Sequence, residues 1–245
     1  MIKLKRIIGA VLVLTLLISC LSSCKAKDPG TLIENADEAL ESAPYTMNIS
    51  VKYDSDDEEM LEAIAEFSNP AIKVIVDGDN FKTHMDLKKD STWNYMTYTY
   101  VDGILYTEWN ENGTVHQEKS TYAEDDKETL KSSLGAGASL GIEDFDDVSS
   151  KKAGKISVIT CDKIKDDALV ALVNALKSQL SSLKAGVAIK DAILLIEIED
   201  GKYRSAVLTC EYYISTSLDT YSIDMTYSVQ FNYGGEASVT APDFD

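Results

Sequence analysis

Residues Tyr221 to Tyr233, YSIDMTYSVQFNY, alternate apolar and polar side chains without a break. Successive side chains of a β-strand point to opposite faces of its sheet, so this period of two predicts a strand with one buried and one solvated face. Such a strand is typical of an antiparallel sheet that packs on one side only. The expected buried face consists of Ile223, Met225, Tyr227, Val229, Phe231 and Tyr233.

Other segments show the same alternation or a similar content of β-branched and aromatic residues. Tyr45 to Tyr53 alternates as strictly as the last strand. Asp102-Gly103, Asp200-Gly201 and the glycine at 113 supply turn chemistry between neighbouring strands, which predicts β-hairpins. Further strands are predicted at 72–76, 81–87, 93–101, 104–109, 155–162, 192–199 and 203–215.

Two segments have the period and the end signals of helices. The first begins at Thr31, the expected N-cap, with Glu34 completing a capping box, and it should end before Pro44. The second, Asp167 to Leu183, is strongly amphipathic. Shorter helices are expected at 59–67 and 124–134. These elements predict an α+β fold: a long, mostly antiparallel sheet with one wet face and apolar helices on the other.

The N-terminus has the layout of a bacterial export signal. Met1 to Arg6 carries three positive charges, and Ile7 to Ile18 is almost wholly apolar. A membrane-spanning helix needs roughly 20 residues, so this run of about twelve matches the hydrophobic region of a signal peptide instead. Two short stretches that end in cysteine follow it, LISC at 17–20 and LSSC at 21–24.

Both stretches resemble the lipobox of bacterial lipoproteins. That resemblance implies that a cysteine thiol receives a diacylglycerol and that cleavage makes this cysteine the new N-terminus. Cys24 is favoured over Cys20. Two small serines directly precede Cys24, whereas the bulky Ile18 lies two residues before Cys20. An ordinary secretory signal with incidental cysteines is the alternative. We expect a signal peptide at 1–23, a tether at 24–30, and one domain at 31–245, anchored to the membrane in the cell envelope outside the cytoplasm.

The charge of the chain excludes one class of partner. The whole chain has 23 Lys and Arg against 41 Asp and Glu, a net charge of −18. Cleavage after residue 23 would remove three basic residues and no acid, which leaves a body of charge −21. Such a body is repelled by nucleic acid and by anionic lipid headgroups. We therefore expect no nucleic-acid partner, and membrane attachment only through the lipid anchor.

The remaining chemistry gives little support for an enzyme. His84 and His116 are the only histidines, and neither lies in a cluster with the spacing of metal ligands. Cys161 and Cys210 each lie in an apolar strand pattern, which suits a buried thiol, although a disulfide is the alternative outside the cytoplasm. If these strands flank 192–199, the two cysteines are too far apart to pair. No catalytic residue, metal or cofactor is expected.

The order of the elements resembles the LolA/LppX-type half-barrel superfamily of bacterial lipoproteins and lipoprotein carriers. The resemblance rests on the helix before YTMNISVKYD (45–54), the hairpin TYVDGILYTE (99–108) and the ending VQFNYGGEASVTAPDFD (229–245). It implies a curved, open antiparallel half-barrel with helices packed on its concave face and an apolar cavity between them. Arg204 is the only arginine outside the signal region, so a carrier mechanism with an internal arginine is not expected.

Two functions are compatible with these sequence patterns and with the resemblance. The first is a non-catalytic, anchored lipoprotein that binds a lipid or another lipophilic ligand in the cavity. The second is a surface interaction or structural lipoprotein whose core is filled and which has no small-molecule ligand. The candidates for the cavity wall are Leu172, Leu176, Leu180, Leu208, Met225 and Tyr227.

Overall fold

A computed structural model describes residues 28–58, 71–86, 93–122, 141–179, 186–215, 219–234 and 237–244. It contains the helices α2 (Pro29–Ser42) and α5 (Asp166–Gln179) and the short 3-10 helix η2 (Ile142–Asp144). Its strands are β1 (Tyr45–Asp54), β2 (Ala71–Asp77), β3 (Asn80–Asp86), β4 (Trp93–Val101), β5 (Ile104–Glu111), β6 (Thr114–Thr121), β7 (Phe145–Ala153), β8 (Ile156–Ile164), β9 (Gly186–Glu199), β10 (Lys202–Ser215) and β11 (Thr220–Tyr233).

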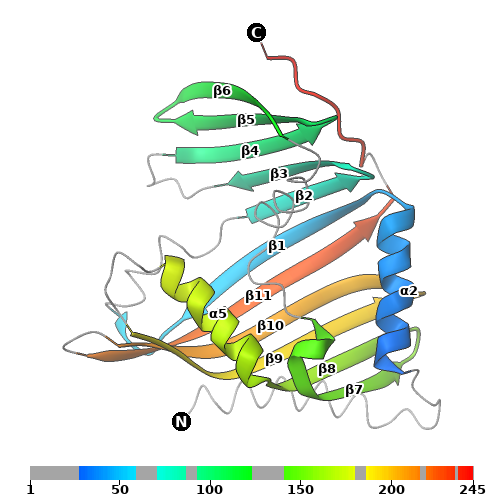
Figure 1. Ribbon diagram of the computed structural model, residues 1–245, viewed down its shortest axis with the longest axis vertical. Coiled ribbons are helices and arrows are strands. Elements are labelled where there is room, and N and C mark those ends of the chain that lie inside the picture. Colours follow the sequence, from blue (N-terminus) through cyan, green and yellow to red (C-terminus); the bar gives the residue numbers. More distant parts are fainter. Residues whose placement is uncertain are drawn as a thin grey trace.

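All of these strands belong to one open antiparallel sheet with the order β6-β5-β4-β3-β2-β1-β11-β10-β9-β8-β7. The sheet consists of two meanders, which we call the first meander (β1–β6) and the second meander (β7–β11). They join where β1 pairs with β11, the strand at the other end of the chain, as Figure 1 shows. The expectation of a mostly antiparallel sheet is confirmed, and the sheet does not close into a barrel.

Tight turns set the register of the hairpins. Asp102 and Gly103 both have positive φ, 50° and 83°, and so do Asn112 and Gly113, at 51° and 85°. Two consecutive residues with positive φ form the turn whose twist matches that of the flanking strands. Asparagine, aspartate and glycine adopt this conformation more readily than other residues, so the sequence itself specifies where these strands reverse.

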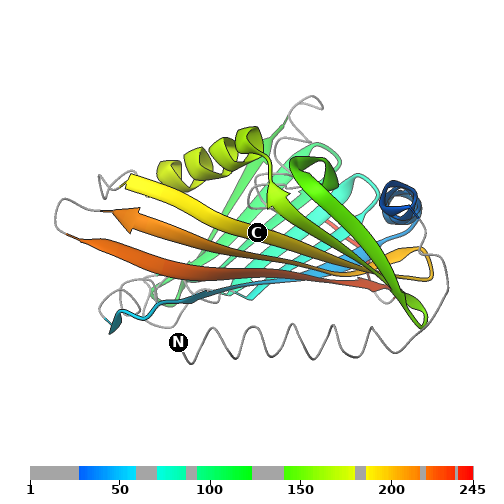
Figure 2. The same ribbon diagram turned by 90° about the horizontal axis from the view of Figure 1, so that it is seen from below.

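The paired residues define the face of the sheet on which the core lies. Val51 pairs with Tyr227, which pairs with Leu208, so these three side chains share one face, called the inner face below. Helices α2 and α5 lie on this side of the sheet (Figure 2). Leu32 and Ala36 of α2 are buried with inner-face residues of β8–β11, whereas α5 packs against β9.

The inner face carries two apolar clusters. Cluster 1 lies on the second meander and cluster 2 mainly on the first, and Tyr227 packs against both. Cluster 1 is largely aliphatic and includes Ile159, Cys161, Ile189, Leu194, Ile196, Ile198, Leu208, Cys210, Tyr212, Ile223 and Met225. Cluster 2 is richer in aromatic residues and consists of Tyr45, Ile49, Val74, Val76, Phe81, Tyr100, Leu105 and Val229.

A β-bulge keeps β9 in phase with its neighbour. Tyr212 pairs with Ile189, but the preceding Glu211 pairs with Asp191, so Lys190 is an extra residue. Without this residue the alternation would carry either Ile189 or Ala192 to the outer face. With it, both are buried on the inner face, at 8% and 3% exposure.

The start of α2 corrects the expected N-cap. The side chain of Asp28, not Thr31, caps the helix, because its Oδ2 accepts a hydrogen bond from the Thr31 backbone N–H at 3.1 Å. Pro29 follows at the first helical position, where its missing N–H costs nothing. The helix therefore includes Pro29 and Gly30, which were expected in the tether. It ends at Ser42, before Pro44 as expected.

The second meander also contains a strand that the sequence did not predict. β7 has the sequence FDDVSSKKA, in which no apolar alternation is visible. It lies at the edge of the sheet and pairs only with β8 among the described residues, so it needs little apolar surface. The helices expected at 59–67 and 124–134 lie outside the described residues.

Candidate functional site

Three of the six predicted cavity residues come together on the inner face. Leu208 on β10 lies directly opposite Tyr227 on β11, and Met225 is the next inner-face residue along β11. Leu208 and Met225 are buried in cluster 1, at 7% and 9% exposure, while Tyr227 is partly exposed. The period of two along these strands was sufficient to place all three on one face.

The other predicted residues are only partly described. Leu172 and Leu176 fall within α5, but their side chains lie outside the described residues, as does the whole of Leu180. The described contact of α5 is with β9, where Ala168 is buried and Leu169 and Val173 pack against cluster 1. The predicted lipidation residue, Cys24, also lies outside the described residues.

Tyrosine hydroxyls supply most of the polar groups on this apolar face. Tyr53 and Tyr212 meet edge to face, with ring centroids 6.5 Å apart. Burial raises the pKa of Tyr53, of Tyr212 and of Tyr227 above the ordinary value for tyrosine. These hydroxyls therefore stay neutral well into alkaline conditions, and each can donate a hydrogen bond without introducing a charge.

A second group of aromatic residues links α2 to the sheet. The Tyr203 hydroxyl donates a hydrogen bond to Asp37 Oδ1 of α2 at 2.7 Å, and the Tyr203 ring stacks on Phe231 with centroids 5.3 Å apart. Burial, and then the Asp37 carboxylate, raise the pKa of Tyr203. Tyr45 packs near Phe231 and Tyr233, so one end of the inner face is lined by aromatic rings.

The inner face continues across the first meander, and the sequence candidates missed this part. Met85 pairs with Met96, which pairs with Trp109, so these three side chains form a row on the inner face of β3–β5. All three are partly exposed. The Trp109 ring stacks on His116 with centroids 5.1 Å apart, and Tyr98 donates a hydrogen bond to Met96 Sδ.

One polar group on this part of the inner face is unusual. Thr83 of β3 pairs with Val74 and Tyr98 and has 0% exposure. Its Oγ1 has no hydrogen-bond partner among the described residues. A buried hydroxyl is ordinarily paired, because leaving it without a partner costs about 1–3 kcal/mol. A polar ligand atom near Thr83 would remove that cost.

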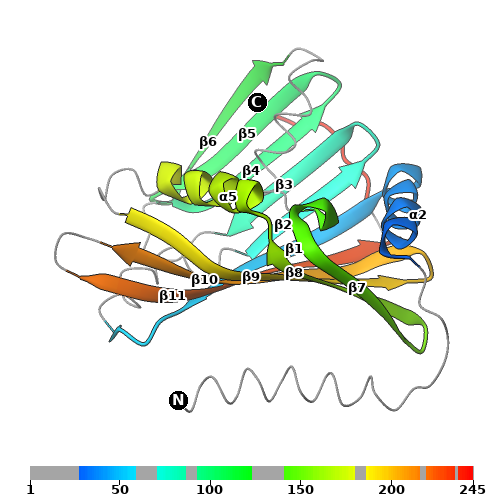
Figure 3. The same ribbon diagram turned by 60° about the horizontal axis from the view of Figure 1, so that its bottom comes forward.

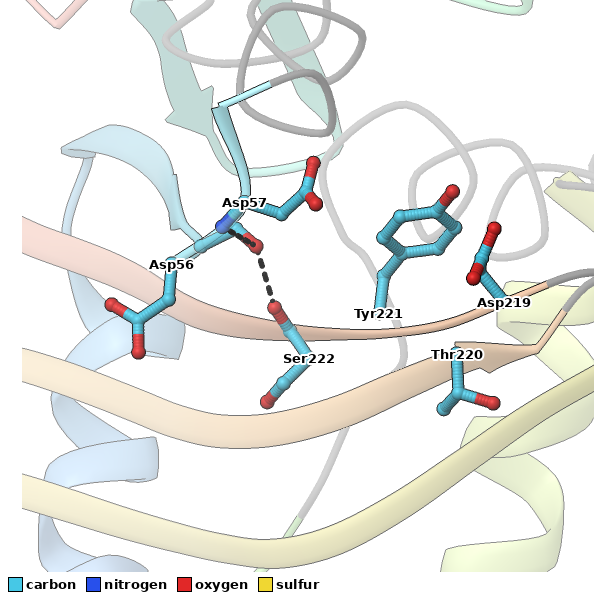
Figure 4. A pocket seen from close by; sticks show the side chains of 7 residues that line it. Asp56, Asp57, Asp219, Thr220, Tyr221 and Ser222 are labelled. Atoms are coloured by element: carbon cyan, nitrogen blue, oxygen red, sulfur yellow. Dashed lines mark hydrogen bonds between the residues drawn. The ribbon is translucent and has the colours of Figure 1, made fainter.

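The described part of the chain also contains an open, acidic pocket of about 550 Å³ at the ends of β1 and β11. Figure 4 shows the carboxylates of Asp56, Asp57 and Asp219. Ser55 Oγ donates a hydrogen bond to the Ser222 carbonyl oxygen at 2.7 Å and accepts one from the Asp57 N–H at 3.3 Å. This polar surface does not suit an acyl chain. The lining residues are Ser55, Asp56, Asp57, Asp219, Thr220, Tyr221 and Ser222.

The described residues form neither a metal-type cluster nor a membrane-spanning helix. Within the described ranges, no group of three or more His, Cys, Asp or Glu side chains could hold a metal ion. His84 lies on the outer face, where its Nδ1 is 2.8 Å from Thr97 Oγ1 and its Nε2 is 3.2 Å from Asp86 Oδ1. None of the described helices has the length and apolar character that crossing a membrane requires.

Comparison with known proteins identifies no family. Neither a protein-family model nor a curated protein matches this chain. Among solved structures, an isomerase-inactive variant of GphF DH1 aligns with 85% of this chain and 82% of its own, at 7% sequence identity and a TM-score of 0.13. A similarity this weak shows neither a shared fold nor a shared activity.

Proposed function

We propose that this protein is a membrane-anchored, extracytoplasmic lipoprotein that binds a lipid or another lipophilic ligand and has no catalytic activity. The ligand lies between the inner face of the sheet and the helices that pack on it, and the sheet curves around them as a half-barrel. The similarity in element order to the LolA/LppX-type superfamily supports this proposal, as does the N-terminal sequence with its lipobox-like cysteines.

The single observation that carries the proposal is the extent of the apolar inner face. In the described residues, the main contacts of α2 are with β10 and β7 and those of α5 are with β9, all in the second meander, and α2 reaches cluster 2 through its partly buried Leu40. The apolar surface nevertheless continues across β3–β5 as the partly exposed row of Met85, Met96 and Trp109. None of these three residues belongs to cluster 1 or cluster 2 among the described residues, so the row adds apolar surface beyond the two clusters.

Apolar burial would supply the affinity for such a ligand. Each methylene group removed from water contributes about 0.8 kcal/mol, so an acyl chain along this row needs no charged partner. Methionines suit this role because their flexible side chains adapt to ligands of different shape. The Thr83 hydroxyl and the neutral tyrosine hydroxyls are the polar groups available to orient the ligand.

Two neighbouring residues provide a matched test. Met96 lies on the inner face of β4 and Thr97 on the outer face of the same strand. We expect Met96→Glu to abolish saturable binding of a fluorescent fatty acid, because the ligand would have to desolvate the new carboxylate. Thr97→Glu introduces the same charge and should bind the probe like the wild type.

The outcome separates the two functions. If wild-type protein shows no saturable binding, or if both variants bind equally, the lipid-binding proposal fails and a filled-core interaction lipoprotein takes its place. Leu176→Trp in α5 provides a second criterion. In a filled core it would overpack and destabilise the fold by about 1–3 kcal/mol, whereas in an open cavity it would block the probe with stability near that of the wild type.

A further inference from the structure

The hydroxyl of Thr83 lies in apolar surroundings on the inner face of β3. Val74 of β2 and Tyr98 of β4 lie directly opposite it, and Phe81 is the preceding inner-face residue of its own strand. Figure 3 shows β2, β3 and β4 side by side in the first meander. Val74 and Phe81 are buried members of cluster 2, and Thr83 has 0% exposure.

Folding alone does not account for a hydroxyl at this position. Valine has nearly the same shape as threonine and would pack against the same neighbours without burying an oxygen atom. Thr83 Oγ1 has no hydrogen-bond partner among the described residues, whereas buried hydroxyls are ordinarily paired. The exception points to a partner that comes from outside the protein. A threonine hydroxyl can both donate and accept, so that partner can be an alcohol or a carbonyl group.

A ligand reaches Thr83 only if a neighbouring side chain moves, because Thr83 has no exposed surface. Tyr98 is the neighbour best suited to move. It is partly exposed, and its hydroxyl donates to Met96 Sδ, which is a weak acceptor. Met85 and Met96 form the next pair on the inner face, so a turn of the Tyr98 ring opens Thr83 toward that row.

The charges of the first meander are divided between its two faces. All the lysines of its described strands alternate with inner-face residues and so lie on the outer face; they are Lys52, Lys73, Lys82 and Lys119. The ionisable side chains on the inner face of β5 and β6 are Glu111, Glu118 and His116. An anionic head group therefore meets carboxylates on this face and no lysine of these strands. Burying a charge without a partner is also far more costly than burying a hydroxyl.

We propose that the ligand carries an uncharged hydrogen-bonding group, such as an alcohol hydroxyl or an ester carbonyl, which bonds to Thr83 Oγ1. Its apolar chain lies along the row of Met85, Met96 and Trp109. This inference rests on the proposed function, because it names the class of lipophilic ligand that the same face selects. Thr83 is then the residue that distinguishes an uncharged lipid from a fatty-acid anion.

Two buried threonines on opposite faces provide a matched pair of variants. Thr83 lies on the inner face and Thr99 of β4 on the outer face, at 0% and 3% exposure. Thr83→Val removes the unpaired hydroxyl, so the delipidated variant should have a higher Tm than delipidated wild type. Thr99→Val makes the same change on the face where no ligand is proposed, and it is the control for binding.

Displacement of the fluorescent fatty acid by two competitors measures the selectivity. 1-Dodecanol ends in a hydroxyl, whereas dodecanoate ends in a carboxylate that is ionised at neutral pH. Thr83→Val should weaken the binding of 1-dodecanol about three- to tenfold, the range expected for one net hydrogen bond. It should leave dodecanoate binding unchanged, because that carboxylate stays in solvent while its chain lies on the row. Thr99→Val should bind both competitors like the wild type.

The outcomes separate this inference from the proposed function. If the wild type shows no saturable binding of the fluorescent fatty acid, the proposed function fails and this inference fails with it. If the probe binds, but Thr83→Val weakens both competitors equally or neither of them, only this inference is overturned, and an enclosed water molecule is the better partner for Thr83. A lower Tm of delipidated Thr83→Val would also overturn it, because the hydroxyl would then have a partner within the protein.

Discussion

The two meanders use the same inner face in different ways. In the second meander the strands β9–β11 are each 14 residues long, and cluster 1 is mainly aliphatic and includes two residues of α2. In the first meander the strands have 7–10 residues, and among the described residues α2 contributes only the partly buried Leu40 to cluster 2. The aromatic and methionine side chains of the inner face continue there toward β5.

This difference suggests that the two meanders have different roles. Ala36, Ile159, Cys161 and Ile223 of cluster 1 all have 0% exposure, which indicates a closely packed core that stabilises the fold. The row Met85, Met96 and Trp109 of the first meander is only partly buried. We therefore assign stability mainly to the second meander, and under the proposed function the row of the first meander extends the ligand site beyond the helices.

The largest expected effect is a buried charge in cluster 1. Ala36 of α2 has 0% exposure, so Ala36→Glu would place a carboxylate in an apolar core. We expect a loss of about 3–5 kcal/mol in the free energy of unfolding, the usual cost of an uncompensated buried charge. Ala171→Glu on the exposed side of α5 is the control and should change stability by less than about 0.5 kcal/mol. Denaturant unfolding measures both, and similar losses would contradict the packing assigned to α2.

The next effect concerns the two thiols of the second meander. Cys161 and Cys210 are free and buried, and β9 separates their strands, so the predicted buried, unpaired state is confirmed. Burial raises the pKa of each to about 11. Thiolate is the reactive form, so at pH 8 both should react with a thiol reagent at least about 100-fold more slowly than an exposed cysteine.

The sign of the pH dependence follows from these pKa values. The rate should rise as the pH approaches 11, because the thiolate fraction increases, and it should reach that of an exposed thiol only after unfolding. Ser149→Cys provides the exposed control in the same protein. Fast reaction of either native thiol at pH 8 would show that cluster 1 is open to solvent.

A smaller effect is expected where α2 docks on β10. Tyr203→Phe removes the hydrogen bond to Asp37 and should cost about 1 kcal/mol, because that carboxylate is exposed. Tyr213→Phe removes a comparable bond, to Glu211, on the outer face and is the control. Hydrogen exchange should accelerate in α2 for the first variant only. Unchanged exchange in α2 would mean that this bond does not hold the helix.

The smallest effect is expected at the C-terminal segment, which crosses the outer face of the first meander. The Phe244 ring meets Tyr106 edge to face at 5.4 Å, and Lys119 Nζ lies 5.6 Å from its centroid. Phe244→Ala should cost about 0.5–1 kcal/mol and leave probe binding unchanged, because the inner face is not touched. Loss of probe binding in this variant would contradict the assignment of the ligand to the inner face.

Local sequence patterns predicted the strands that have one buried and one solvated face, but they did not predict the edge strand β7. β1 and β11 alternate strictly because one of their faces is buried or partly buried along the strand. β7 has no such requirement at the edge, so its polar sequence carried no strand signal. The Asp28 cap was missed because Thr31 and Glu34 fit a capping box equally well in sequence, and only the backbone shows where the helix begins.

The candidate site was predicted in part for a similar reason. Leu208, Met225 and Tyr227 lie on strands adjacent in sequence, so the period of two and one hairpin were sufficient to bring them together. Met96 and Trp109 join the same face only through the pairing of β1 with β11, which are separated by most of the chain. Pairing across that distance leaves no local signal in the sequence.

The most direct test of the central claim is native mass spectrometry of the mature protein after gentle extraction from the membrane. The account predicts a native mass that exceeds the denatured mass by that of a lipophilic molecule, since a covalent diacylglycerol survives denaturation and a bound ligand does not. Met96→Glu should lose this excess and Thr97→Glu should keep it. Equal native and denatured masses, together with no saturable fatty-acid binding, would contradict the account.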